Sequence, residues 1–248
     1  MKDKYKDLFD LIDDVCSSKL RIERKSPVST VLKNVAYFHY CKAINLGKAI
    51  SILCANGRAT EASILLRSLL NVYIDIKWIA HNDSLTRAQR YVDFEIVFRR
   101  SHYEAAIAHG TLQKPKNDSK YIQDGMKVDR ILKKYNIRSL DKAYNWSGKS
   151  IKNMATEIGE EWAYHVLYAR ASATEHTCPS SVVDYWNGDT LLTSPQEKDI
   201  PSVILSTVDY LLLIMLIAAK SLWASYRDFA FFRMRLGDLS TEYLGSVN

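Results

Sequence analysis

The stretch ATEASILLRSLLNVYIDIKWIA, residues 59–80, decides the fold class of this chain. Its apolar residues recur every three or four positions, as they do on one face of an α-helix, and no glycine or proline interrupts it. Its polar residues recur at the same steps on another face. We therefore expect a long helix that packs into a core. The apolar set is Ile64, Leu65, Leu69, Val72, Ile76 and Ile79, and the polar set is Thr60, Ser63, Arg67, Asn71 and Asp75.

The polar face of this helix has two interpretations. In the first, it faces the solvent, as in most amphipathic helices. In the second, part of it lies inside the bundle, because the helix is unusually apolar for a surface element. A buried Arg67 would then need a carboxylate or several carbonyl groups to offset the loss of hydration.

The rest of the chain supports the same fold class. Only 9 glycines and 5 prolines occur in 248 residues, whereas a strand-rich sandwich needs a turn roughly every 8–12 residues. We predict an all-α fold, a single bundle of long antiparallel helical hairpins in one domain. The domain spans 1–248, with a core at about 30–235 on which a helix at 2–24 packs. Further helices are expected at 30–54, 84–109, 121–135, 149–157, 160–176 and 202–234, with Ser29 or Thr30, Gly57, Asp83 or Ser84, and Gly110 at their ends.

The composition argues against several kinds of protein. The four cysteines lie far apart with no C-x-x-C pair, so we expect no metal site, no cofactor and no disulfide framework. The opening residues MKDKYKDLFDLIDD are charged throughout, which does not fit a signal peptide. We expect a cytoplasmic protein.

One segment, VILSTVDYLLLIMLIAAKSLW at 203–223, is apolar enough to raise the question of a membrane span. Asp209 and Lys220 limit its uninterrupted apolar run to 211–219, well short of the roughly 20 residues that a span needs. We predict a buried core helix and no membrane span.

The chain is basic, with a formal net charge of +6 and a pI near 9.0, which suits an anionic partner such as RNA. The segment TRAQRYVDFEIVFRRSHYEAA, at 86–106, sets arginines among aromatic residues, a pattern that can serve phosphates and stacked bases. In the alternative, the aromatics belong to the core and the arginines are only solvated. The candidate contacts are Arg87, Arg90, Arg99 and Arg100.

The segment YARASATEHTCPSS, at 168–181, holds Arg170 and His176 with five residues between them. His165, Ser172 and His176 would share one side of a regular helix. Arg170 would lie about 120° around the helix from His176, since each residue advances by about 100°. A site that uses both therefore needs a loosened helix, another helix or a second subunit.

Several segments together resemble an uncharacterised bacterial family of all-helical domains of unknown function. The match runs from about 35 to 220, and its most specific parts are WSGKS and a Y-x3-S-x3-H pattern, here Tyr168, Ser172 and His176. Many members carry a glutamate where this chain has Asn71. The matching segments are RATEASILLRSLLNVYIDIKWI (58–79), RAQRYVDF (87–94), WSGKSIKNMATEIG (146–159) and YHVLYARASATEHTCPSS (164–181).

That family is similar to the HEPN superfamily, whose ribonucleases are small helical bundles common in toxin–antitoxin and phage-defence systems. They carry an arginine and a histidine four to six residues apart, and Arg170 and His176 fit that spacing. The polar residue that usually follows the arginine is Ala171 here. The resemblance implies metal-independent RNA cleavage, with His176 as general base or acid and Arg170 stabilising charge on phosphorus. It also implies a homodimeric site, with Tyr168, Ser172 and Glu175 in supporting positions.

Two functions remain open. The first is a HEPN-like endoribonuclease of toxin or phage-defence type. The second is a non-catalytic helical module that binds a nucleotide or a protein partner. Ala171, which stands where a polar residue is usual, favours this second function. In that module Arg67, Ser172 and His176 would form a structural polar network.

Overall fold

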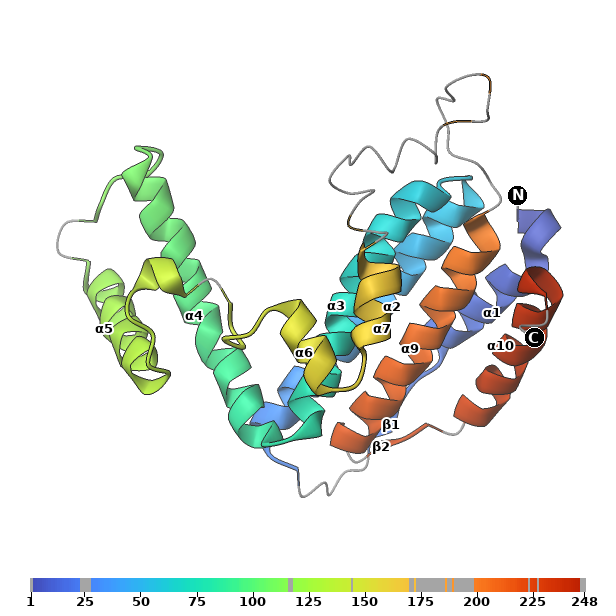
Figure 1. Ribbon diagram of the computed structural model, residues 1–248. Coiled ribbons are helices and arrows are strands. Elements are labelled where there is room, and N and C mark those ends of the chain that lie inside the picture. The colour runs from blue at the N-terminus through green and yellow to red at the C-terminus, as the bar shows by residue number, and fades with distance from the viewer. Residues whose placement is uncertain are drawn as a thin grey trace. The chain divides into compact units, whose positions relative to one another are not determined.

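The chain has an all-α fold in the computed structural model (Figure 1). The structure describes residues 2–22, 28–115, 118–143, 145–169, 172, 186, 189, 199–222, 224–226 and 228–245. Contacts within the chain fall into two compact units, the first made of residues 1–82 and 151–248 and the second of residues 83–150. The single domain expected from the sequence stays a prediction.

The first unit carries most of the helices. At its amino-terminal end, a 3₁₀ turn, η1, leads into α1, and two-residue strands β1 and β2 form a small antiparallel pair. A short π-helical segment, η3, continues directly from α7. The bounds are η1 Lys2–Tyr5, α1 Lys6–Ser17, β1 Arg21–Ile22, α2 Thr30–Ala55, α3 Ala59–His81, α6 Ile151–Glu157, α7 Glu161–Ala163, η3 Tyr164–Tyr168, α9 Ile200–Leu222, β2 Ala224–Ser225 and α10 Phe229–Leu244.

The core of the first unit lies where α2, α3 and α9 pack on one another, with α1 and α10 against α9. The length and apolar composition of α9 would suffice for a membrane span over Ile200–Ser221, which no other helix among the described residues matches. In the structure 67% of that apolar window is buried inside the protein. As expected from the sequence, α9 is a core helix of this unit.

Close packing at the centre of α2 depends on Gly47. A β-carbon at this position would lie 2.8 Å from Leu211 Cδ1 on α9 and 2.9 Å from Cys16 Sγ on α1. These distances are shorter than real β-carbon contacts, so a side chain at Gly47 would require the Leu211 and Cys16 side chains to move. Glycine therefore allows α2 to approach both neighbours.

Glycines follow two of the long helices as expected, whereas Ser29 and Asp83 precede α2 and the helix Ser84–Ala108 without forming a side-chain cap. Gly57, between α2 and α3, has φ of 71°, and its amide donates to the Cys54 carbonyl at 3.0 Å. Asp83 precedes the fourth helix in the left-handed region, and Gly110 follows it with φ of 72°. Glycine adopts this conformation without strain, which explains why it follows helices so often.

Three of the expected helices are corrected. The helix expected at 2–24 ends at Ser17, because Ser18 is extended and Arg21–Ile22 pair with β2. The closing helix expected at 202–234 is two helices, α9 and α10, with β2 between them. The helix expected at 160–176 begins as a single α turn and then widens into η3; of its later part only Ala169 and Ser172 are described.

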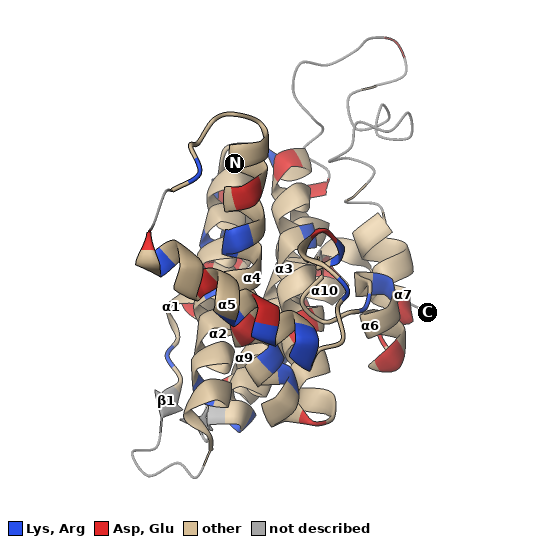
Figure 2. Cartoon of the chain, turned by 90° about the vertical axis from the view of Figure 1, so that its left-hand side faces the viewer, with Lys and Arg blue, Asp and Glu red and all other residues tan. Residues whose placement is uncertain are grey.

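The second unit consists of two long helices and a compact turn. α4 spans Ser84–Ala108, α5 spans Ser119–Lys134, and a 3₁₀ turn, η2, covers Leu140–Lys142. The Asp118 side chain caps α5 by accepting hydrogen bonds from two backbone amides, at 2.8 and 3.1 Å. Both basic residues, in blue, and acidic residues, in red, occur along α5 (Figure 2).

Candidate functional site

The polar face of α3 lies partly inside the first unit. Thr60 is buried, while Ser63, Arg67, Asn71 and Asp75 are half-buried. Part of this face is covered because α3 packs on α6 and η3. The second interpretation of the sequence therefore holds for the part of the helix around these residues.

Arg67 contacts the aromatic side chain of Tyr168, which comes from η3. Its guanidinium donates a hydrogen bond to the Tyr168 hydroxyl at 2.9 Å and lies 4.7 Å from the ring centre. The Tyr168 ring in turn stacks on Tyr164, with centres 5.0 Å apart and planes 18° from parallel. A cation that both stacks on a ring and donates to its hydroxyl is held in a defined place.

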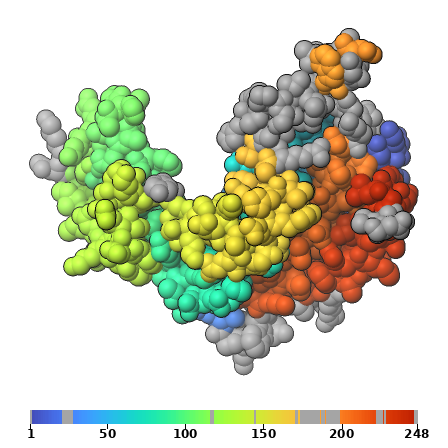
Figure 3. Space-filling view, viewed as in Figure 1, coloured from blue at the N-terminus to red at the C-terminus, as the bar shows by residue number. Residues whose placement is uncertain are grey.

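The five residues of η3 form a π-helix, wider than the α-helix expected there. Such insertions are rare and are frequently found at functional sites. His165, on this segment, is exposed and its Nε2 lies 3.6 Å from Glu161 Oε1. Ser172 is half-buried in helical conformation. Figure 3 shows the side chains of α6, α7 and η3, in yellow, at the surface of the first unit.

Asn71 adds a buried acceptor one helical turn from Arg67. Its side-chain oxygen is shielded from solvent, and no residue in the described part of the chain hydrogen-bonds to it. Buried acceptors normally have a partner, so this oxygen marks a position of interest.

A second polar cluster, which the sequence analysis missed, joins α3 to the start of α7. The Tyr73 hydroxyl donates to Glu160 Oε1 at 2.6 Å, and Lys77 donates both to Tyr73 at 3.1 Å and to Glu160. Burial, and then the hydrogen bond to Glu160, raise the pKa of Tyr73, so it stays a neutral donor. The Tyr-x3-Lys spacing on one helix face could have indicated the pair, but Glu160 could not be assigned to it from sequence.

Three of the proposed site residues, Arg170, Glu175 and His176, lie outside the described residues. The structure brings together two of their expected supporting residues, Arg67 and Tyr168, and places Asn71 on the same helix as Arg67.

In the second unit, Arg90 supports the fold of the WSGKS turn. It donates to the Trp146 carbonyl at 2.6 Å and lies 4.8 Å from the Tyr135 ring centre. Burial lowers its pKa. Within the turn, the Ser147 hydroxyl donates to Asn145 Oδ1 and accepts from the Lys149 amide, both at 3.0 Å. The WSGKS segment is therefore a hydrogen-bonded turn packed on an arginine.

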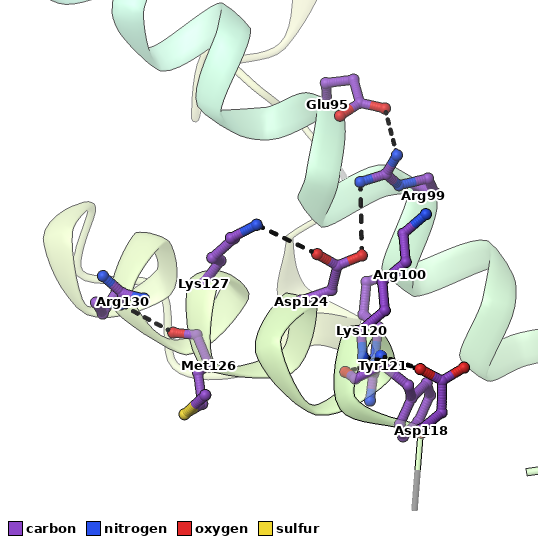
Figure 4. A network of polar contacts seen from close by, with 10 residues as sticks. All are labelled: Glu95, Arg99, Arg100, Asp118, Lys120, Tyr121, Asp124, Met126, Lys127 and Arg130. Carbon is purple, nitrogen blue, oxygen red and sulfur yellow. Dashed lines mark hydrogen bonds and ion pairs between the residues drawn. The ribbon is translucent and has the colours of Figure 1, made fainter. Parts of the chain in front are cut away.

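The other arginines of α4 differ in their surroundings. Arg100 pairs with Glu104 at 2.6 Å and donates to the Tyr121 carbonyl at 2.9 Å, so it is held within the unit. Arg99 is 57% exposed and lies 3.7 Å from both Glu95 and Asp124 (Figure 4). Arg87 is half-buried.

These features define an all-helical protein with a half-buried arginine–tyrosine contact and a turn-stabilising arginine. Residues 33–190 match the model of a family of unknown function (DUF5677). The chain belongs to this family. Searches of curated proteins and of solved structures found no match.

Proposed function

We propose that this chain is a HEPN-like helical protein that cleaves RNA without a metal ion, with Arg170 and His176 as the catalytic pair. The contact between Arg67 and Tyr168 carries the proposal, since it holds a cation and a phenol at the segment that leads into the pair. His176 takes the proton from the ribose 2′-hydroxyl or gives one to the leaving oxygen. Arg170 stabilises the negative charge that develops on the phosphate.

Arg67 and Tyr168 have supporting roles in this mechanism. A planar guanidinium matches the geometry of phosphate oxygens and remains charged at all physiological pH values. The Tyr168 hydroxyl accepts a hydrogen bond from Arg67, which leaves its own proton available for a phosphate oxygen. Ser172 and Glu175 orient the histidine or the phosphate.

The proposed enzyme works in the cytoplasm as a homodimer of toxin or phage-defence type. In a regular helix Arg170 and His176 would lie about 120° apart around the axis. In a homodimer this separation is no obstacle, since the histidine of one subunit can meet the arginine of the other. Basic residues of α4 add affinity for RNA.

A second function is favoured because the polar residues contact one another within the chain. Tyr73, Lys77 and Glu160 bind one another within one chain, as Arg67 and Tyr168 do. Satisfied polar networks of this kind fix one packing arrangement. In this alternative the chain is a non-catalytic module that binds a nucleotide or a protein partner.

The experiment that separates these functions measures RNA cleavage and thermal unfolding together. Total RNA is incubated with the purified wild type, with His176→Ala and with His81→Ala, in the presence of a chelator. His81 is an exposed histidine at the end of α3 and serves as the matched control. Melting temperatures of all three proteins are recorded by circular dichroism.

Cleavage that survives chelation, leaves cyclic phosphate ends and disappears only in a stably folded His176→Ala protein supports the ribonuclease. Absence of cleavage in all three, with His176→Ala destabilised by about 1–3 kcal/mol, supports the structural network instead. Cleavage that persists in His176→Ala contradicts the assigned catalytic pair.

A further inference from the structure

A hollow of about 200 Å³ lies within the second unit, between α4 and the first turns of α5. Residues at positions 96, 99, 100 and 103 line it from one face of α4, as their helical spacing requires. Arg99, Arg100, Lys120, Asp118 and Asp124 supply its charges, so cations outnumber carboxylates three to two. Figure 4 shows these five charged side chains where the two helices meet.

Arg100 forms the fixed wall of the hollow. Its guanidinium lies 3.6 Å from the centre of the Tyr121 ring, while Glu104 and the Tyr121 carbonyl hold its N–H groups. The Tyr121 hydroxyl donates to Glu104 at 2.7 Å and completes this arrangement. A wall whose side chains are held by several contacts needs little reorganisation when a ligand binds.

Two other cations remain adjustable. Arg99 lies 3.7 Å from its acidic neighbours, 1.1 Å farther than Arg100 lies from Glu104. Glu95 is exposed and Asp124 is 20% exposed, and pairs as long as these near the surface contribute little stability, so a phosphate can replace them at low cost. Lys120 is exposed at the start of α5 and forms no ion pair with the residues that the structure describes.

The carboxylates of the hollow already have partners. Asp118 caps α5, and Asp124 lies between Arg99 and Lys127. When Arg99 turns to a phosphate, Asp118 keeps its amide donors and Asp124 keeps Lys127, which reduces the repulsion between these carboxylates and the phosphate.

Tyr103 and Ile96 supply the apolar surface. The Tyr103 ring is half-buried, with its centre 5.7 Å from that of Tyr121. A tyrosine beside exposed cations is a typical platform for a base of a single strand, because stacking tolerates any base while the cations follow the backbone.

We propose that this hollow binds one nucleotide of single-stranded RNA, with the base on Tyr103 and the phosphate between Arg99 and Lys120. The inference rests on the proposed function for the choice of RNA, and it adds a binding position remote in sequence from RASATEH. It also separates Arg90 and Arg100, which maintain the unit, from Arg99, which contacts the strand.

The test uses a fluorescein-labelled ten-nucleotide RNA of mixed sequence with 2′-O-methyl groups. It cannot be cleaved through the 2′-hydroxyl, so binding is measured apart from catalysis. Fluorescence anisotropy gives the Kd for the full chain in chelator at several salt concentrations. The variants are Tyr103→Ala, Tyr103→Phe and Arg99→Ala, with Arg130→Ala as the control that removes one exposed positive charge of α5.

Tyr103→Ala is expected to weaken binding about tenfold, and Tyr103→Phe to bind like the wild type because it keeps the stacking face. Arg99→Ala is expected to weaken binding several-fold and to reduce the slope of log K against log salt by about one. Arg130→Ala should change Kd by less than about twofold. Circular dichroism establishes that each variant is folded.

The proposal is overturned if wild type does not bind the oligonucleotide, or if folded Tyr103→Ala and Arg99→Ala bind as tightly as wild type. Cleavage of ordinary RNA, measured in parallel, separates the two ideas. If Tyr103→Ala and Arg99→Ala bind RNA like wild type while wild type cleaves RNA, the nucleotide site in the hollow is rejected and the ribonuclease is retained. If the two variants bind RNA more weakly but wild type does not cleave RNA, the nucleotide site in the hollow is retained and the ribonuclease is rejected.

Discussion

His39 is expected to make the first unit less stable in mild acid. The imidazole is 1% exposed on α2, and its Nδ1 donates to the Val35 carbonyl at 2.7 Å. Burial lowers the pKa of His39 to about 4, below its usual value of 6.5. The neutral ring is therefore the form that the folded protein holds.

The size and sign of the effect follow from the two pKa values. Between pH 6.5 and pH 4 the unfolded chain binds a proton at His39 that the folded chain does not, so stability falls as the pH falls. The full difference of 2.5 pKa units corresponds to about 3 kcal/mol, at 1.36 kcal/mol per unit. About 2 kcal/mol of this is lost between pH 7 and pH 5.

Urea unfolding at pH 7, 6 and 5 measures this loss in wild type, His39→Gln and His81→Gln. His39→Gln cannot titrate, so it should lose about 2 kcal/mol less than wild type over the range, whatever its stability at pH 7. His81→Gln, at an exposed position, should follow the wild type. Parallel losses in wild type and His39→Gln would refute the reasoning, as would an NMR titration giving His39 a pKa near 6.5.

Four further outcomes are expected from guanidinium or thermal unfolding. Gly47→Val should destabilise the protein by about 1–3 kcal/mol, since the Leu211 side chain already occupies that space. Gly237→Ala in α10, where a β-carbon meets nothing within 4 Å, should stabilise the protein by about 0.5–1 kcal/mol. Asp118→Ala should cost about 1 kcal/mol through the lost cap of α5, and equal stability with wild type would contradict that role. Tyr168→Phe keeps the ring under the Arg67 guanidinium but loses its hydroxyl, so a loss of about 1 kcal/mol is expected and a gain would show the hydrogen bond to be unimportant.

Local signals predict the helix ends well. Gly57 and Gly110 both adopt positive φ where a helix ends, and the expected bounds of α2, α3 and α4 agree with the structure within about two residues. Such ends depend on a few neighbouring residues, so they can be inferred from sequence.

Features that depend on distant partners were not predictable. The break between α9 and α10 interrupts an apolar pattern that continues through it, because β2 pairs with β1 about 200 residues earlier in the chain. Similarly, the arginines of α4 look alike in sequence, and distant contacts, such as those of Arg90 with the Trp146 carbonyl and the Tyr135 ring, separate its role from that of Arg99.

The candidate site was predictable in part. The repeat of polar residues on α3 correctly placed Arg67 and Asn71 on one face, but their burial depends on η3 covering that face. The π-helical geometry of η3 has no signal in the residues themselves. Glu160 joins Tyr73 only because α7 begins beside α3, which no periodicity reveals.

The first unit is discontinuous in sequence, and this has a consequence for folding during synthesis. α9 completes the core with α2 and α3, yet about 120 residues separate α3 from the start of α9, including the whole second unit. Contacts of such long range slow folding and leave apolar surface exposed until the last helices emerge from the ribosome. The second unit is built from neighbouring segments and can fold while α2 and α3 are still without α9. A nascent chain arrested near residue 190 should therefore resist proteolysis at 83–150 before it does at 30–82.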